Sequence, residues 1–137
     1  MPVPKPVRPL VLIVDDVADV RAALRFLLET DEFRVIEAGD AASAVAELEK
    51  HQVDVLLADL YMPGTVDGVA LIDLVHRMPR RPKGIIAMSG APHLAYRSSL
   101  QAARYVGADE TLTKPIAKET LVTTIRRLIG GGPALRP

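Results

Sequence analysis

Hydrophobic residues in this chain occur in two alternating patterns. Short runs enriched in apolar or β-branched residues, typical of buried strands, lie at residues 10–14, 33–37, 53–59, 84–88 and 110–113. Between and after these runs, apolar residues recur at helical spacing and predict helices over residues 17–28, 41–50, 69–75, 94–106 and 121–129. This alternation predicts an α/β fold, with a parallel sheet, right-handed crossovers and helices on both faces.

The first and fourth predicted helices carry recognisable end signals. Asp16 is predicted to cap the first helix, because aspartate is a favoured N-cap residue. Gly107 is predicted to end the fourth helix as its C′ residue, a position that favours glycine. On the first helix the predicted inward positions are Val17, Val20, Leu24, Leu27 and Leu28, and the predicted outward positions are Asp19, Arg21, Arg25 and Glu29.

The chain is predicted to form one domain. Its 137 residues are enough for a single sizeable core. We expect this domain to span residues 10–129. A proline-rich, disordered lead-in at residues 1–9 would precede it, and a short flexible tail at residues 130–137 would follow it.

Composition narrows the classes of function. The chain has 17 basic and 17 acidic side chains, and this balance disfavours a direct nucleic-acid binder or a polybasic membrane binder. It has no cysteine, which excludes disulfides and thiolate metal sites. No apolar run approaches the roughly 20 residues that span a bilayer, and the N-terminus lacks the apolar core of a signal peptide. We therefore expect a soluble, cytoplasmic protein without membrane insertion.

Polar side chains stand at the ends of most of the predicted strands. They are Asp15 and Asp16 after the first strand, Asp59 on the third, Ser89 on the fourth and Lys114 after the fifth. The carboxyl ends of parallel strands share one edge of the sheet, where open α/β folds bind their ligands. Each residue alone is more simply a helix cap or a turn residue. Their joint occurrence at one edge predicts a functional site.

The predicted site combines three carboxylates, a hydroxyl and an ammonium. Clustered carboxylates repel one another unless a cation neutralises them, and a ligand set of oxygens alone favours Mg²⁺. An ammonium suits a phosphoryl oxygen, and a hydroxyl can donate a hydrogen bond to another. Phosphoryl transfer is catalysed by such positioning and charge neutralisation. The residues therefore predict a site where Asp59 receives a phosphoryl group as an aspartyl phosphate.

Longer motifs surround these residues and carry a family resemblance. They are Val11–Asp16, Ala58–Pro63 with Asp67-Gly68 beyond it, Met88–Gly90 and Gly107–Pro115. Over residues 10–129 the sequence resembles the response regulator receiver domain of two-component signalling. The resemblance implies a flavodoxin-like (βα)₅ sandwich with strand order 2-1-3-4-5. We expect a stand-alone receiver without an output domain, which signals through protein–protein contacts.

The resemblance also implies a role for each polar residue. Asp59 would accept the phosphoryl group from a histidine kinase or a histidine phosphotransfer protein. Asp16, Asp59 and the backbone carbonyl of Tyr61 would hold Mg²⁺, and Asp15 would support the metal through water and the lysine. The residues that would contact the phosphoryl oxygens are Ser89 and Lys114.

Three features depart from the family pattern. Thr111 stands where most relatives carry tyrosine or phenylalanine, and it cannot reproduce the aromatic rotation that couples phosphorylation to the output face. The loops at residues 63–68 and 90–100 are slightly longer than usual and flank the predicted acceptor. The onward path of the signal is therefore less well defined than the chemistry.

Two alternative functions stay open at this point. An aspartyl-phosphate phosphohydrolase usually carries a second carboxylate two residues after the nucleophile. Tyr61 stands at that position, so we do not expect a multiple-turnover enzyme. A phosphorylation-independent interaction module would keep the fold without the chemistry. The complete set of polar strand ends disfavours this module, whereas Thr111 leaves room for it.

Overall fold

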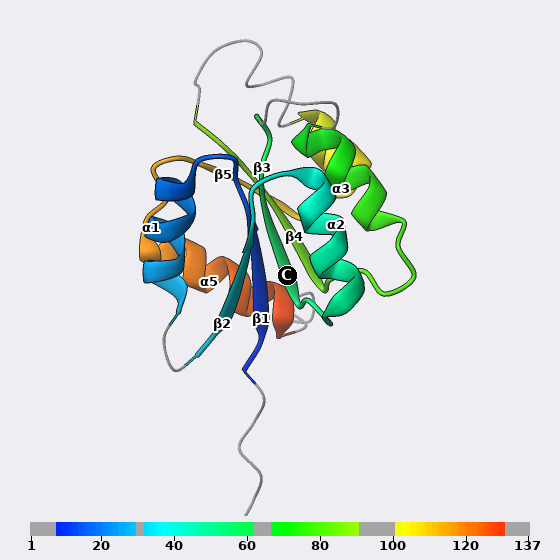
Figure 1. The fold of residues 1–137 in the computed structure, drawn as a ribbon. Coiled ribbons are helices and arrows are strands. Elements are labelled where there is room, and N and C mark those ends of the chain that lie inside the picture. Colours follow the sequence, from blue (N-terminus) through cyan, green and yellow to red (C-terminus); the bar gives the residue numbers. More distant parts are fainter. Residues whose placement is uncertain (1–7, 30–31, 62–66, 91–100, 131–137) are drawn as a thin grey trace, which may run out of the picture.

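The computed structural model describes residues 8–29, 32–61, 67–90 and 101–130. They form a parallel sheet of five strands in the order β2-β1-β3-β4-β5 (Figure 1). The strands are β1 (Leu10–Val14), β2 (Arg34–Ala38), β3 (Val55–Asp59), β4 (Gly84–Ser89) and β5 (Glu110–Thr113). The predicted α/β fold and the strand order 2-1-3-4-5 are confirmed.

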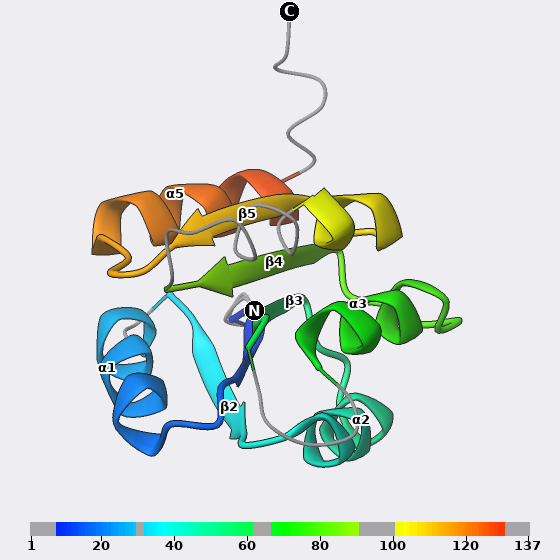
Figure 2. The same cartoon turned by 90° about the horizontal axis from the view of Figure 1, so that it is seen from above.

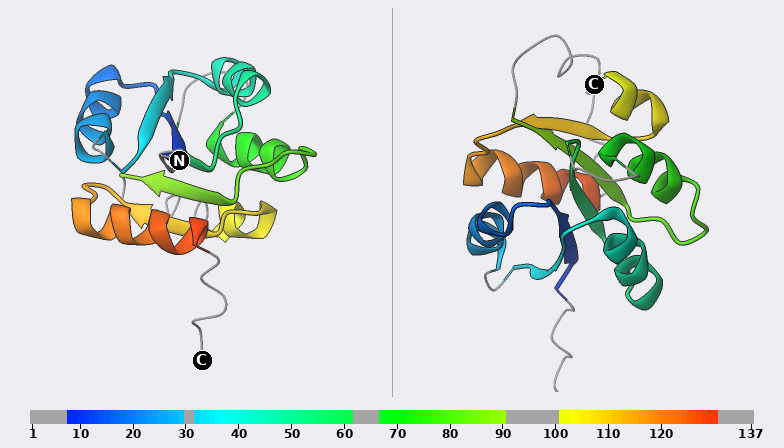
Figure 3. Two further views of the ribbon diagram at one scale, coloured as in Figure 1. Left: turned by 90° about the horizontal axis from the view of Figure 1, so that it is seen from below. Right: turned by 45° about the horizontal axis from the view of Figure 1, so that its top comes forward.

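Helices cover both faces of this sheet. They are α1 (Ala18–Leu28), α2 (Ala41–Lys50), α3 (Gly68–His76) and α5 (Lys118–Ile129), and residues 101–106 are helical as well. Figures 2 and 3 show α1 and α5 on one side of the sheet and α2 and α3 on the other. Within the described ranges, no helix is both long and apolar enough to cross a membrane.

Two apolar cores, one on each face, hold the helices on the sheet. Alternate residues of a strand point to opposite faces. Leu12 therefore packs in the core with α2 and α3, whereas Ile13 packs in the core with α1 and α5. Because both faces are covered, every residue of β1, β3 and β4 is buried. This double burial explains the continuous apolar runs in the sequence.

Two strands begin later than the sequence pattern predicts. The strand predicted at residues 33–37 lies at 34–38, because Arg34 pairs with Leu10 and its N–H donates to the Pro9 carbonyl. The strand predicted from residue 53 begins at Val55. Asp54 precedes it and accepts the Leu10 N–H on its carboxylate at 2.8 Å. In both cases contacts with the start of β1 set the register.

The prediction that Asp16 caps α1 is wrong. The N-cap is Val17, and no side chain caps this helix. The Val17 N–H instead donates to the Asp15 carboxylate at 2.9 Å, so the preceding aspartate holds the turn. As the N-cap residue, Val17 is exposed rather than inward-facing, whereas Leu24 and Leu28 are buried as predicted.

The helix predicted over residues 94–106 is helical at residues 101–106. Gly107 follows with a φ of 130°, the positive region that favours glycine at a C′ position. Residues 94–100 of the predicted helix lie outside the described residues. So do most of the lead-in, the tail and the two longer loops.

The start of α3 packs directly against the end of β3. The Gly68 N–H donates to the Leu60 carbonyl at 3.3 Å. A Cβ atom at position 68 would lie 2.2 Å from the Asp59 carbonyl oxygen and 2.5 Å from the Leu60 Cα, so this approach requires glycine. Asp67 caps the same helix by accepting the Ala70 N–H at 2.9 Å. The Asp67-Gly68 motif therefore anchors α3 to the strand end that carries Asp59.

Replacing Gly68 with alanine is expected to destabilise the fold, because backbone atoms of Asp59 and Leu60 would have to move. We expect the free energy of unfolding to fall by about 2 kcal/mol, as at other overpacked sites, in urea titrations followed by circular dichroism. Gly90→Ala is the control, since its methyl group would meet the Lys114 side chain at 3.6 Å, an ordinary contact distance. Equal stability of the two variants would contradict the close packing.

Candidate functional site

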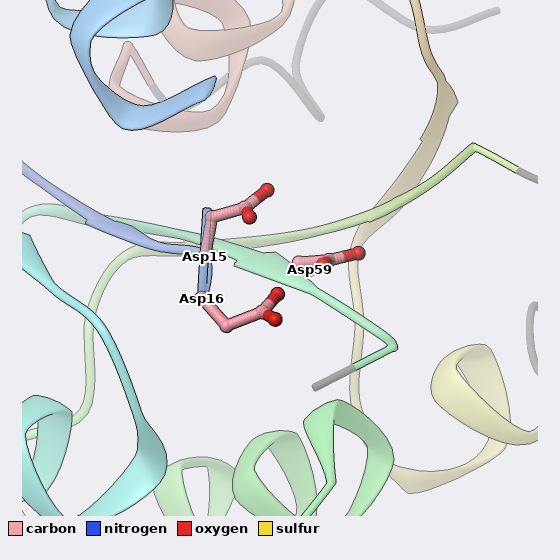
Figure 4. Close-up of side chains that lie close together, drawn as sticks. All are labelled: Asp15, Asp16 and Asp59. Carbon is pink, nitrogen blue, oxygen red and sulfur yellow. The ribbon is translucent and has the colours of Figure 1, made fainter. Parts of the chain in front are cut away.

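The polar strand ends converge at one edge of the sheet. Asp15 and Asp16 follow β1, and Asp59 ends the neighbouring strand β3. One carboxylate oxygen from each of the three residues lies within 4.8 Å of the others. Figure 4 shows the side chains of Asp15 and Asp16 extending toward the same side as that of Asp59. The predicted cluster of carboxylates is thus formed by neighbouring strands.

Asp15 is fully buried, and both of its carboxylate oxygens accept hydrogen bonds. Oδ1 accepts the Val17 N–H at 2.9 Å, and Oδ2 accepts Lys114 Nζ at 2.7 Å. The Asp15 N–H in turn donates to the Ala38 carbonyl on β2 at 3.2 Å. Asp15 therefore ties the turn after β1 to the lysine that follows β5.

Asp59 lies beside the same lysine and is 5% exposed. Lys114 Nζ is 3.5 Å from Asp59 Oδ1, and the Tyr61 N–H donates to that oxygen at 3.3 Å. Burial raises the pKa of the Asp59 carboxyl, and repulsion from Asp15 raises it further, whereas Lys114 and the Tyr61 hydrogen bond lower it. Because burial outweighs these favourable contacts, an added cation would stabilise the charged carboxylate.

Ser89 supplies the hydroxyl of the site. It ends β4 directly after Met88, the residue that pairs with Asp59 across the sheet. Its side chain is fully buried, and among the described residues its Oγ has no hydrogen-bond partner. A buried hydroxyl without a partner is uncommon, because it has lost its water. Ser89 therefore offers a hydrogen bond to a ligand oxygen at the end of β4.

The donor set fits Mg²⁺, which takes oxygen ligands and commonly one or two carboxylates with water and phosphate oxygens. Asp16 is exposed, whereas Asp15 is buried and already bonded to Val17 and Lys114. The carboxylates best placed to contact a metal directly are therefore those of Asp16 and Asp59. The contribution of the Tyr61 carbonyl stays a prediction.

One contact of this site cannot be recognised from the sequence pattern. Helical spacing predicts that Arg21 faces outward, but its side chain is 20% exposed. Its Nη1 donates to the Asp15 carbonyl at 2.7 Å. The contact depends on how α1 packs against the turn after β1, and the spacing of apolar residues carries no signal for it.

The family model described as the response regulator receiver domain matches residues 11–126. The chain belongs to this family. The resemblance to the receiver domain of two-component response regulators is therefore confirmed.

Individual relatives agree with this membership. The 14.6 kDa protein in the sodA1 3′ region of Leptolyngbya boryana, described as uncharacterized, is 33% identical over 118 residues, which cover 85% of this chain and 87% of that protein. The sensory transduction protein RegX3 of Mycolicibacterium smegmatis is 30% identical over 122 residues, which cover 89% of this chain and 51% of RegX3. The chain spans about half the length of RegX3 and of several other curated relatives that it matches.

Solved structures show the same fold. The structure of the chemotaxis protein CheY4 of Vibrio cholerae superposes with a TM-score of 0.77 at 29% identity, covering 89% of this chain and 99% of that one. A CheY-like receiver domain protein from Methanospirillum hungatei has a TM-score of 0.81 at 23% identity, covering 95% and 100%. The receiver fold therefore extends over nearly the whole chain.

Asp59→Asn is expected to stabilise the metal-free protein at pH 7. Since burial raises the pKa of Asp59 in the folded state, keeping this carboxylate charged costs free energy of folding at neutral pH. That cost is lost as the pH falls through the raised pKa toward the unfolded-state value of about 3.9. The difference in the free energy of unfolding between Asp59→Asn and wild type should therefore shrink as the pH falls through this range.

Urea denaturation in the presence of a chelator measures this difference. Asp73→Asn is the control, because Asp73 lies at the surface of α3 and pairs with Arg77, where a change of less than about 0.5 kcal/mol is expected. A lower stability of Asp59→Asn than of wild type at pH 7 would contradict the electrostatic account of the site.

Proposed function

We propose that this receiver domain is a phosphoacceptor switch, in which Asp59 takes a phosphoryl group from a phosphohistidine of a histidine kinase or histidine phosphotransfer protein. The observation that carries the proposal is the pair of buried carboxylates, Asp15 and Asp59, on either side of one ammonium, Lys114. Membership of the receiver-domain family supports it.

In the proposed transfer, a carboxylate oxygen of Asp59 forms a bond to phosphorus while the bond from phosphorus to the donor's imidazole nitrogen breaks. Lys114 would pair with one phosphoryl oxygen, and the Ser89 hydroxyl would donate a hydrogen bond to another. Asp16, Asp59 and the Tyr61 carbonyl would hold Mg²⁺, and Asp15 would support the metal through water and Lys114. When bound, Mg²⁺ would supply charge neutralisation for the phosphoryl oxygens.

A groove beside the acceptor supports transfer from a protein donor. It has a volume of about 560 Å³ and lies between α1 and the segment that precedes α5. Its lining is mainly apolar and includes Lys114, so a protein bound there would lie next to Asp59. The lining residues are Asp19, Val20, Ala23, Leu24, Leu27, Gly90, Lys114, Pro115 and Ile116.

We propose a reversible switch rather than a multiple-turnover enzyme. The residue two positions after Asp59 is Tyr61, and not the second carboxylate that phosphohydrolases of this kind usually carry as their acid or base. For the onward signal we propose protein–protein contacts. Thr111 lies half-buried on β5 opposite Ala87, and its small side chain carries no ring that a rotation would move.

Incubation with a small acyl phosphate and Mg²⁺ tests the proposal. Mass spectrometry of the intact wild-type protein is expected to show one added phosphoryl group, and a chelator is expected to abolish the addition. Asp59→Asn is expected to gain none. Asp73→Asn, the same substitution at the surface of α3, should be phosphorylated like wild type. Modification of Asp59→Asn at the wild-type rate would rule out Asp59 as the acceptor.

A further inference from the structure

The peptide groups on both sides of Asp16 are held by hydrogen bonds. The carbonyl before it, that of Asp15, accepts Arg21 Nη1 at 2.7 Å. The N–H after it, that of Val17, donates to Asp15 Oδ1 at 2.9 Å. Because peptide groups are planar units, fixing these two groups fixes the direction in which the Asp16 side chain leaves the backbone.

Asp16 has particular need of such support. It is exposed, it follows the last residues of β1, and it lies before the first residue of α1 rather than inside either element. An exposed residue outside regular structure would otherwise lose conformational entropy when it binds a metal. Because of the two hydrogen bonds, Asp16 loses this conformational entropy when the protein folds and not when the metal binds.

Arg21 is itself anchored on the edge strand β2. Its Nε donates to Glu37 Oε1 at 3.1 Å, and Glu37 also accepts Arg25 Nε at 2.5 Å. The hydrogen bonds from Arg25 and Arg21 lower the pKa of Glu37, so this carboxylate is charged at neutral pH. The guanidinium of Arg21 therefore bridges Glu37 and the Asp15 carbonyl with two of its donors.

A guanidinium is suited to this bridge, because its donors point in fixed, different directions within one plane. A lysine ammonium is a point charge and would favour one of the two acceptors. Arg25 differs from Arg21 in its partners, since its Nη1 pairs with Glu29, the exposed C-cap residue of α1. The two arginines share Glu37 but reach different groups with their other donors.

We propose that Arg21 is a positioning residue for the magnesium site: it fixes the peptide group between Asp15 and Asp16 and so directs the Asp16 carboxylate to the metal. This inference rests on the proposed function. Arg21 would contact neither the metal nor the phosphoryl group. It acts through Asp15 and Asp16.

Titration with Mg²⁺, followed by nuclear magnetic resonance of the Asp16 and Tyr61 amides, compares wild type, Arg21→Met and Arg25→Met. The Kd for Mg²⁺ is expected to rise about tenfold in Arg21→Met, as when other supporting residues of metal sites are removed. In Arg25→Met it should change less than about twofold, although both variants lose an ion pair with Glu37. Urea titrations of the same proteins report the loss of stability separately.

Hydrogen exchange in the metal-free proteins gives a second readout. Protection of the Val17 amide is expected to fall in Arg21→Met and to persist in Arg25→Met, because only the first change releases the turn around Asp16. If Arg21→Met does not fold, Arg21→Lys takes its place. Its Kd for Mg²⁺ should be higher than the Kd of wild type and of Arg25→Met, but by less than tenfold.

The outcomes separate this inference from the proposed function. Wild-type affinity in Arg21→Met, or equal weakening in Arg21→Met and Arg25→Met, would contradict the positioning role alone. Failure of the wild-type protein to bind Mg²⁺ in a saturable way would contradict the proposed function, and the positioning role with it. Weaker Mg²⁺ binding in Arg21→Met but not in Arg25→Met, together with lower hydrogen-exchange protection of the Val17 amide, supports both the positioning role and the proposed function.

Discussion

The ammonium of Lys114 lies between two buried carboxylates, 2.7 Å from Asp15 and 3.5 Å from Asp59. Buried carboxylates need compensation, because they have lost their water and repel each other. Lys114 supplies one positive charge, and a third carboxylate, Asp16, lies beside them. In the proposed function, a metal cation neutralises the remaining negative charge and allows a phosphoryl group to bind. The proposed chemistry of the site follows from this imbalance of charge.

The parallel sheet makes this arrangement possible. The order β2-β1-β3-β4-β5 places the ends of β1 and β3 side by side, so residues far apart in sequence, Asp15 and Asp59, lie together. Lys114 reaches Asp15 over a sequence separation of 99 residues. Gly68 then allows α3 to pack on the backbone of Asp59. The apolar cores on both faces keep the strand ends in register.

Much of the fold and of the site is predictable from the sequence, because buried parallel strands are continuous apolar runs and their ends are polar. The identities of Asp15, Asp59, Ser89 and Lys114 as strand-end residues follow from that pattern alone. The prediction that Asp16 caps α1 is wrong for a physical reason. A local preference for aspartate at N-caps cannot reveal that the Asp15 carboxylate takes the Val17 N–H. The hydrogen bond from Arg21 to the Asp15 carbonyl also cannot be predicted from the sequence pattern, because it depends on tertiary packing.

The proposed function requires that Asp59, and not its acidic neighbours, carries the phosphoryl group. An acyl phosphate on a carboxylate is reduced by borohydride to an alcohol, which converts an aspartyl phosphate into homoserine. Peptide mapping by mass spectrometry after phosphorylation and reduction then locates the modified residue. Phosphorylation of Asp59 is expected to give homoserine at position 59 and unmodified aspartate at positions 15 and 16. Homoserine at position 15 or 16, or at no position in a phosphorylated sample, would contradict it.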